Sequence, residues 1–250
     1  MKEENKNVVI MNFSDAYKME VFAHNPDFNI IDCSDIHGTD CFCSYMAEKI
    51  ICSRIKTLHP QGIHFIDSGD YHYVSKFWTD KIKQPFTLVL IDHHTDMQPS
   101  GIQGLLTCGN WVNAVIGQNT FLRQVIIIGA PGGHSEMLPQ PLMQKTKIVS
   151  PDDFRRVLRG EIGLDIATPV YVSIDKDVLG AKSAATNWDQ GQMSLSELCR
   201  FLTIMYSSSD IIGTDVCGEF STLQSISAER AAACLDSHAN ETILYTISAC

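Results

Sequence analysis

Eight short, continuous apolar runs constrain the fold of this chain more than any other feature of its sequence. They lie at residues 8–13, 30–33, 62–66, 88–91, 125–129, 147–149, 170–174 and 211–216. Most of them do not alternate between apolar and polar residues, which is typical of parallel strands that are covered on both faces. Amphipathic stretches near 44–58, 72–82, 110–117, 151–159, 194–206 and 225–239 predict helices between and after the runs. This alternation predicts an α/β fold with a mostly parallel sheet.

One of the predicted helices has a recognisable start. Ser194 followed by Glu197 fits a capping box. Apolar residues at 195, 198, 202 and 205 then repeat at helical spacing, so we expect a helix over 194–206. No low-complexity linker and no internal repeat divides the chain, which predicts a single domain over residues 1–250.

Composition and charge exclude several classes of protein. Hydrophobic residues make up 44% and charged residues 19% of the chain, which rules out a mainly disordered protein. The net charge of −10 disfavours a nucleic-acid partner and suits a cationic substrate. No secretory signal and no apolar run long enough to span a membrane is found. The nine cysteines are odd in number and form no CxxC pair, so we expect reduced thiols in a cytoplasmic protein.

Polar residues that could bind a metal follow two of the apolar runs. In parallel sheets, ligands bind beyond the carboxyl ends of the strands. Asp92, His94 and Asp96 come directly after one run as D-x-H-x-D, and alternate residues of an extended segment point the same way. Asp175 and Asp177 follow a second run in the same manner. The intervening lysine at 176 is expected to point away from both carboxylates.

A third segment, Asp67-Ser-Gly-Asp70-Tyr-His72, follows the run at 62–66. Either Asp70 or His72 could act as a ligand there. Taken singly, each of these acids and histidines could be a cap, a turn residue or a hydrogen-bonded core residue. Two separate alternating clusters that each follow a buried-type strand are hard to explain in that way.

Divalent metal ions would explain why these residues cluster. Four aspartates packed together would repel one another, and two doubly charged ions would neutralise them. Oxygen and imidazole ligands without a thiolate favour a hard or borderline ion such as Mn²⁺. A pair of such ions can bridge one water and present it as hydroxide near neutral pH.

These segments resemble the ureohydrolase superfamily of arginases, agmatinases and formimidoylglutamases. Residues 68–72 resemble its GGDH-type segment with one extra residue, 92–96 its DAHxD segment, and 173–177 its SxDxD segment. The resemblance extends from about residue 60 to about residue 220. It implies a three-layer α/β/α fold, a centre of two Mn²⁺ ions or another divalent metal, and hydrolysis at a guanidino or amidino carbon.

The resemblance also implies a ligand set. One metal would be held by His72, Asp92, Asp96 and Asp175, and the other by Asp92, His94, Asp175 and Asp177. Asp92 and Asp175 would bridge the two ions. The bridging hydroxide would attack the substrate carbon, and Asp96 would orient it and pass a proton to the leaving amine.

Three departures from the family pattern concern the substrate. The loop after Asp177 lacks the family's prolines, and Asn187 and Asp189 are candidate substrate-binding residues in it. Asp189 could meet a cation, although an exposed charge is the commoner outcome for an aspartate in a loop. Cys108 stands where arginases carry a proton-shuttling histidine. Its thiol either transfers a proton or is a passive neighbour of the site, and we favour the passive role. Glu219 is the candidate that would grip a guanidinium group, although the segment 215–219 is one residue longer than the family's DxxE.

The resulting prediction is a dinuclear metallohydrolase acting on non-peptide C–N bonds. Its substrate would be a small cationic guanidino compound, such as arginine or agmatine, or an arginine-containing peptide. The alternatives are a zinc-dependent amide deacetylase of the same fold, or a metal-binding protein with little catalysis. Family members commonly form homo-oligomers, and the sequence carries no clear interface signal.

Overall fold

A parallel sheet organises the structure, a computed structural model that describes residues 7–99, 101, 104–131, 144–221 and 225–250. The eight strands run in the order β2-β1-β4-β10-β9-β5-β7-β8, and each neighbouring pair is parallel. They are β1 (Val8–Asn12), β2 (Asn29–Asp32), β4 (Ile63–Ile66), β5 (Phe86–Ile91), β7 (Leu122–Ile128), β8 (Thr146–Val149), β9 (Val170–Asp175) and β10 (Ile211–Cys217). All eight predicted strands are confirmed.

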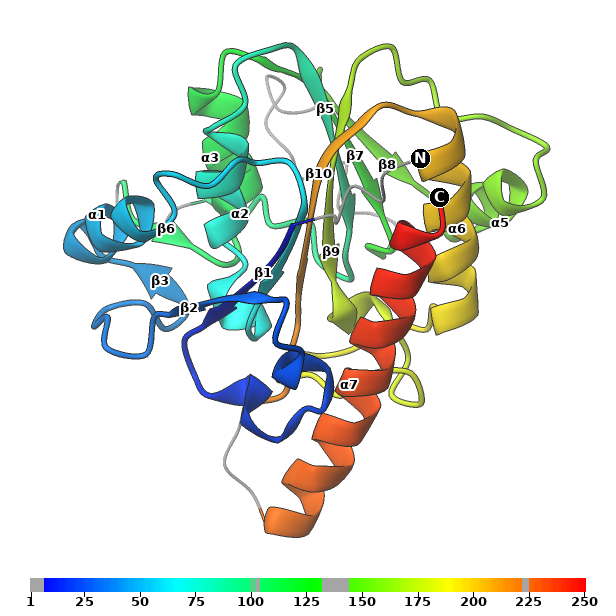
Figure 1. The fold of residues 1–250 in the computed structure, drawn as a ribbon. Helices are drawn as coiled ribbons and strands as arrows, with labels where there is room; N and C mark the ends of the chain where they lie inside the picture. Colours follow the sequence, from blue (N-terminus) through cyan, green and yellow to red (C-terminus); the bar gives the residue numbers. More distant parts are fainter. Residues whose placement is uncertain (1–6, 100, 102–103, 132–143, 222–224) are drawn as a thin grey trace.

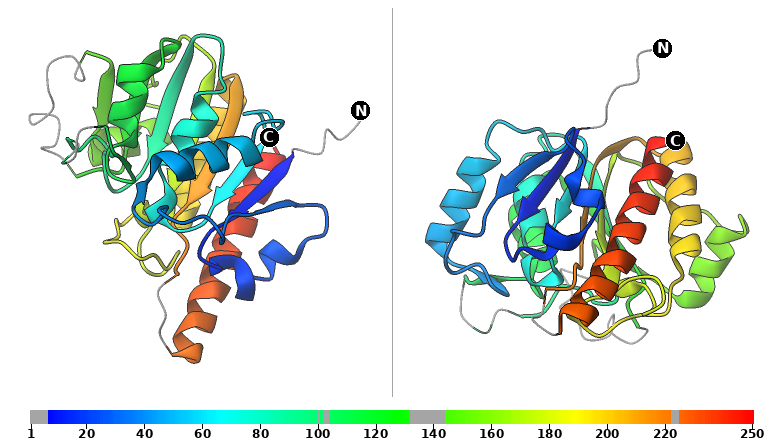
Figure 2. Two further views of the ribbon diagram at one scale, coloured as in Figure 1. Left: turned by 90° about the vertical axis from the view of Figure 1, so that its left-hand side faces the viewer. Right: turned by 60° about the horizontal axis from the view of Figure 1, so that its bottom comes forward.

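Two helical layers cover the sheet, as Figures 1 and 2 show. One layer contains α1 (Tyr45–Arg54), α2 (Val74–Thr79) and α3 (Trp111–Gln118), and the other contains α5 (Pro151–Leu158), α6 (Leu195–Ser208) and α7 (Ile226–Ser248). Successive strand residues face opposite layers, so Leu88 and Leu90 join the first core and Val89 and Ile91 join the second. Burial on both faces explains why the runs are continuously apolar and confirms the three-layer α/β/α arrangement.

The helices largely follow the predicted segments. Helix α7 is longer than predicted, because the apolar pattern continues beyond residue 239 to Ile243 and Ile247, which are buried. The sequence did not predict the short antiparallel pair of β3 (Phe42–Cys43) with β6 (Leu106–Thr107), since two residues are too few to show a period. Among the described residues, no helix is both long enough and apolar enough to cross a membrane.

The strand order brings the predicted ligand segments together. Strands β4, β10, β9 and β5 are consecutive neighbours in the middle of the sheet. The segments after β4, β5 and β9 carry the candidate ligands, and because all strands are parallel these segments leave the same edge of the sheet. The two-residue strands β3 and β6 pair beside this edge and contribute residues to the cavity described below.

The capping box of α6 provides a test of local stability. The Oγ of Ser194 accepts a hydrogen bond from the Glu197 amide at 3.3 Å, and the Glu197 carboxylate accepts one from the Ser194 amide at 2.9 Å. We expect Ser194→Ala to lower the free energy of unfolding by about 1 kcal/mol in urea titrations. Ser207→Ala, at an exposed position in the last turn of the same helix, is the control and should change it by less than about 0.5 kcal/mol. An equal loss in both variants would contradict the role of the cap.

Candidate metal centre

A first cluster of ligand-type atoms surrounds the ring of His72. A single turn of 3-10 helix, η3 (Gly69–Tyr71), places this histidine beneath the ends of β5 and β9. Its Nδ1 atom lies 3.1 Å from Oδ2 of Asp96, 3.3 Å from Oδ2 of Asp92 and 3.4 Å from Oδ2 of Asp175. One ring nitrogen cannot hydrogen-bond to three carboxylates at once. Atoms that bind one ion at about 2.1 Å lie about 3 Å apart, so these distances suit shared coordination.

The other nitrogen of His72 has a partner that fixes the orientation of the ring. Its Nε2 atom lies 2.9 Å from Oγ of Ser173, whose hydroxyl donates to Oδ1 of Asp215 at 2.6 Å. The Ser173 oxygen is therefore free to accept a hydrogen bond from Nε2–H. This orientation directs Nδ1 of His72 toward the carboxylates. Histidine ligands of metals are commonly oriented in this way.

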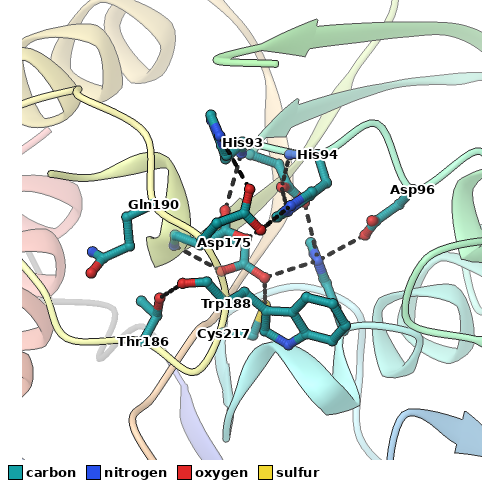
Figure 3. Close-up of polar contacts among 12 residues, drawn as sticks. His93, His94, Asp96, Asp175, Thr186, Trp188, Gln190 and Cys217 are labelled. Atoms are coloured by element: carbon teal, nitrogen blue, oxygen red, sulfur yellow. Dashed lines mark hydrogen bonds and ion pairs between the residues drawn. The ribbon is translucent and has the colours of Figure 1, made fainter. Parts of the chain in front are cut away.

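A second cluster forms around His94, which is half-buried at the end of β5. Its Nδ1 atom lies 2.8 Å from Oδ2 of Asp177 and 3.6 Å from Oδ1 of Asp92. Oδ1 of Asp177 accepts a hydrogen bond from the amide of His93 at 3.0 Å. On the outer side, Nε2 of His94 lies 3.1 Å from Oδ1 of Asp189; Figure 3 shows His94 beside Asp175. Asp189 therefore lies in the position of an orienting carboxylate for His94.

The electrostatics of both clusters fit divalent cations. Burial and the repulsion of Asp92 raise the pKa of Asp96 to about 6. Burial and the charges of Asp175 and Asp92 raise the pKa of Asp177 well above its usual range. Oδ2 of Asp92 is buried and has no hydrogen-bond partner among the described residues. The groupings His72, Asp92 and Asp96, and Asp92, His94 and Asp177, each bring their ligand atoms within 4.8 Å of one another.

A cavity of about 420 Å³ opens onto both clusters. Its walls contain Phe42, Leu105 and Trp188 as larger apolar groups and Gln98 and Thr107 as polar groups. Cavities of this size hold small molecules. Among the described residues that line it, the acidic ones are the aspartates of the clusters, Asp92, Asp96, Asp175 and Asp177.

Cys108 also lines this cavity. Burial and the charges of Asp96 and Asp70 raise the pKa of its thiol to about 12. Without metal, burial and the neighbouring carboxylates thus favour the neutral form of the Cys108 thiol.

The structure distinguishes between the two candidates of the segment after β4. His72 joins the first cluster, whereas Asp70 faces the rim. Oδ1 of Asp70 accepts from the indole of Trp188 at 3.0 Å, and Oδ2 accepts from the amide of Asn187 at 3.2 Å. Asn187 also hydrogen-bonds to Ser221 at 2.7 Å and does not line the cavity. Asn187 and Asp189 thus support the rim and His94, which differs from the substrate contacts predicted for them.

Glu219 lies apart from the cavity, contrary to the expected grip on a guanidinium group. It is fully buried, and its carboxylate pairs with Lys176 and accepts from Nδ2 of Asn240 at 2.9 Å. Lys176 also lies 3.5 Å from Asp236, so its charge is matched on the α7 side of the sheet. The extra residue in 215–219 explains the difference, because Gly218 occupies the place where the family's DxxE has its glutamate. In this structure its carboxylate faces Lys176 and Asn240, and Glu219 does not line the cavity.

Sequence reasoning missed the partners that hold the ligands in place. Trp111 Nε1 donates to Oδ2 of Asp96 at 2.6 Å, and Ser173 orients His72. The thiol of Cys217 lies 3.1 Å from Oδ2 of Asp175. These residues sit inside apolar segments, where they look like ordinary core residues. The strand register, which pairs Asp175 with Cys217, is the signal that connects one of them to the centre.

The fold and the site together define a class: an α/β protein with a buried carboxylate and imidazole centre at the carboxyl edge of a parallel sheet. The model of the arginase family matches residues 9–239. The chain therefore belongs to the arginase family. It is also 28% identical over 211 residues to an uncharacterized protein of Thermotoga maritima, an alignment that covers 78% of this chain and 80% of the relative.

Solved structures show the same fold at low sequence identity. The proclavaminate amidino hydrolase of Streptomyces clavuligerus is 18% identical, with a TM-score of 0.68 over 98% of this chain and 92% of that one. The formiminoglutamase of Trypanosoma cruzi, in a structure with Mn²⁺, is 12% identical, with a TM-score of 0.66 over 98% of this chain and 95% of that one. These similarities establish an arginase-like fold.

The position of Asp189 predicts an effect on metal affinity. Removing an orienting carboxylate behind a ligating histidine typically costs 10- to 100-fold in metal affinity, so we expect about that loss for Asp189→Asn. The affinity can be measured by competition with a chromophoric chelator. Asp165→Asn, at an exposed position before the start of β9, whose other end carries Asp175, should leave the affinity unchanged. Equal affinities for the two variants would contradict this role of Asp189.

The ligand pKa values predict that metal binding depends on pH. Contacts with Asp177 and Asp92 raise the pKa of His94 to about 11, so without metal its ring is protonated at neutral pH. A metal can bind Nδ1 only after the proton leaves, so binding should release protons and strengthen as pH rises. Each proton released corresponds to about a tenfold gain in affinity per pH unit. Calorimetry in buffers of different ionisation enthalpy should show this release; identical heats in all buffers would contradict it.

Proposed function

We propose that this chain is a dinuclear metallohydrolase that cleaves a C–N bond of a guanidino or amidino group. The observation that carries the proposal is the position of Asp92. Its Oδ2 lies 3.3 Å from His72, and its Oδ1 lies 3.6 Å from His94. One carboxylate therefore faces both ligand clusters, which is the arrangement expected of a bridging ligand. Mn²⁺ in a related structure and an amidino hydrolase among the structural relatives support the metal and the reaction.

The chain would divide the chemistry between bound ions and its own residues. Divalent ions held by the clusters would supply a nucleophile at neutral pH by lowering the pKa of water. His72 and His94 are oriented for this task by Ser173 and Asp189. Asp96, held by the Trp111 indole, would pass a proton to the leaving amine.

The cavity indicates how a substrate would lie. The amidino end would approach the aspartates, because they are the acidic groups in the described lining. The rest of the substrate would contact Phe42, Leu105 and Trp188 and could hydrogen-bond to Gln98. Since Glu219 is paired with Lys176, recognition of a cationic group would depend on the centre itself. A small guanidino or amidino compound fits the volume of about 420 Å³.

The test combines metal content with a screen of substrates. Protein loaded with Mn²⁺ should contain about two ions per chain by elemental analysis, and should release urea or ammonia from a panel of guanidino and amidino compounds. Asp92→Asn should lower the metal content and reduce kcat/KM by about a thousandfold or more, because both clusters lose a charge. Asp165→Asn is the matched control and should retain both properties.

Other outcomes would identify the competing functions. A single zinc ion per chain, with release of acetate from acetylated amines, would indicate an amide deacetylase. Two ions per chain without turnover across the whole panel would indicate a metal-binding protein. The absence of bound metal from both the unsubstituted protein and the Asp165→Asn control would contradict the proposed chemistry.

A further inference from the structure

A cysteine adjoins the first ligand cluster. Cys217 is the last residue of β10 and is fully buried. In the register of the sheet it pairs with Asp175, the last residue of β9. Its Sγ atom lies 3.1 Å from Oδ2 of Asp175, the same oxygen that lies 3.4 Å from Nδ1 of His72. Figure 3 shows the sulfur directed at this carboxylate from below.

A second observation concerns the carboxylate of Asp92, which lies beside the same histidine ring. Oδ2 of Asp92 is buried, with 1% of the residue exposed, and it has no hydrogen-bond partner among the described residues. It faces the same nitrogen of His72 at 3.3 Å. The donor atoms of His72, Asp175 and Cys217 also lie within 4.8 Å of one another. The ring of His72 thus joins two neighbouring groups of donor atoms, one with Asp92 and Asp96 and the other with Asp175 and the Cys217 thiol.

The backbone that follows Cys217 packs closely against Asp175. Gly218 follows with φ of +97°, a conformation that side chains disfavour. A Cβ atom at Gly218 would lie 2.5 Å from Oδ1 of Asp175, so the strand end packs directly against this ligand. The Gly218 amide also donates to the carbonyl of Asp67 at 3.0 Å. Together these contacts fix the backbone that follows Cys217.

We propose that Cys217 is a thiolate ligand of an ion that His72 and Asp175 hold at the first cluster. This inference rests on the proposed centre of two metal ions. It adds a sulfur ligand to one of the two metal positions. On binding, the Sγ–H proton leaves to solvent and the sulfur lone pair binds the ion, so one proton is released for each metal–sulfur bond. A thiolate is a soft ligand, and it shifts the preference of this position from Mn²⁺ toward Zn²⁺.

X-ray absorption at the zinc edge tests the proposal without an activity assay. Zinc–sulfur bonds are about 2.3 Å long and zinc–nitrogen or zinc–oxygen bonds about 2.0–2.2 Å, so the two are resolved. We expect one sulfur neighbour per chain in protein loaded with stoichiometric Zn²⁺. Elemental analysis of the same samples gives the number of ions bound. A spectrum of the unsubstituted protein that shows only nitrogen and oxygen, with zinc present, would overturn the proposal and leave the metal centre intact.

Variants identify the sulfur, because all nine cysteines are free and two others line the cavity. Cys217→Ser should lose the sulfur neighbour and lose more affinity for Zn²⁺ than for Mn²⁺. The double variant Cys41→Ser with Cys108→Ser should keep the sulfur neighbour, and it assigns the ligand even if Cys217→Ser does not fold. Loss of the sulfur in the double variant, or its persistence in Cys217→Ser, would overturn the proposal. Protein that binds no zinc would contradict both this inference and the metal centre.

Discussion

Repulsion among buried aspartates is the constraint on which this site depends. Asp92, Asp96, Asp175 and Asp177 leave adjacent strands at one edge of the sheet, and each is almost completely buried. Like charges in such a place stay ionised only when cations accompany them. Two histidines supply part of that charge when protonated, and divalent ions would supply it more completely. The fold brings these groups together because parallel neighbouring strands end at the same edge.

The surrounding residues make the cluster rigid. Ser173 with Asp215, Trp111 and Asp189 each hold one ligand from outside, and each belongs to a different element or loop. Ligands that are oriented before an ion binds lose less conformational freedom on binding. The same contacts explain why the site contains buried polar groups within an otherwise apolar core.

The sheet and the ligand segments could be predicted from the sequence because their signals are local. Continuous apolar runs marked all eight strands, and the spacing of Asp92, His94 and Asp96 marked the ligands that follow β5. The position of Glu219 could not be predicted, since it depends on a buried pair with Lys176 that joins distant segments. The role of Asp189 depends on a loop that returns to His94 across 95 residues. Contacts of this kind leave no periodic pattern in the sequence.

Lys176 lies between two candidate metal ligands in the sequence, yet its ammonium group points to the opposite side of the strand end. There it meets Glu219 and Asp236, and Asn240 joins the same group from α7. Burial lowers the pKa of this lysine, but Asp236, Glu219 and Glu20 outweigh burial and raise it overall, so the ammonium stays charged. The end of β9 therefore contacts the aspartate cluster on one side and the C-terminal helix on the other. One backbone segment, Asp175–Asp177, therefore carries both the aspartates of the centre and the lysine that contacts the C-terminal helix.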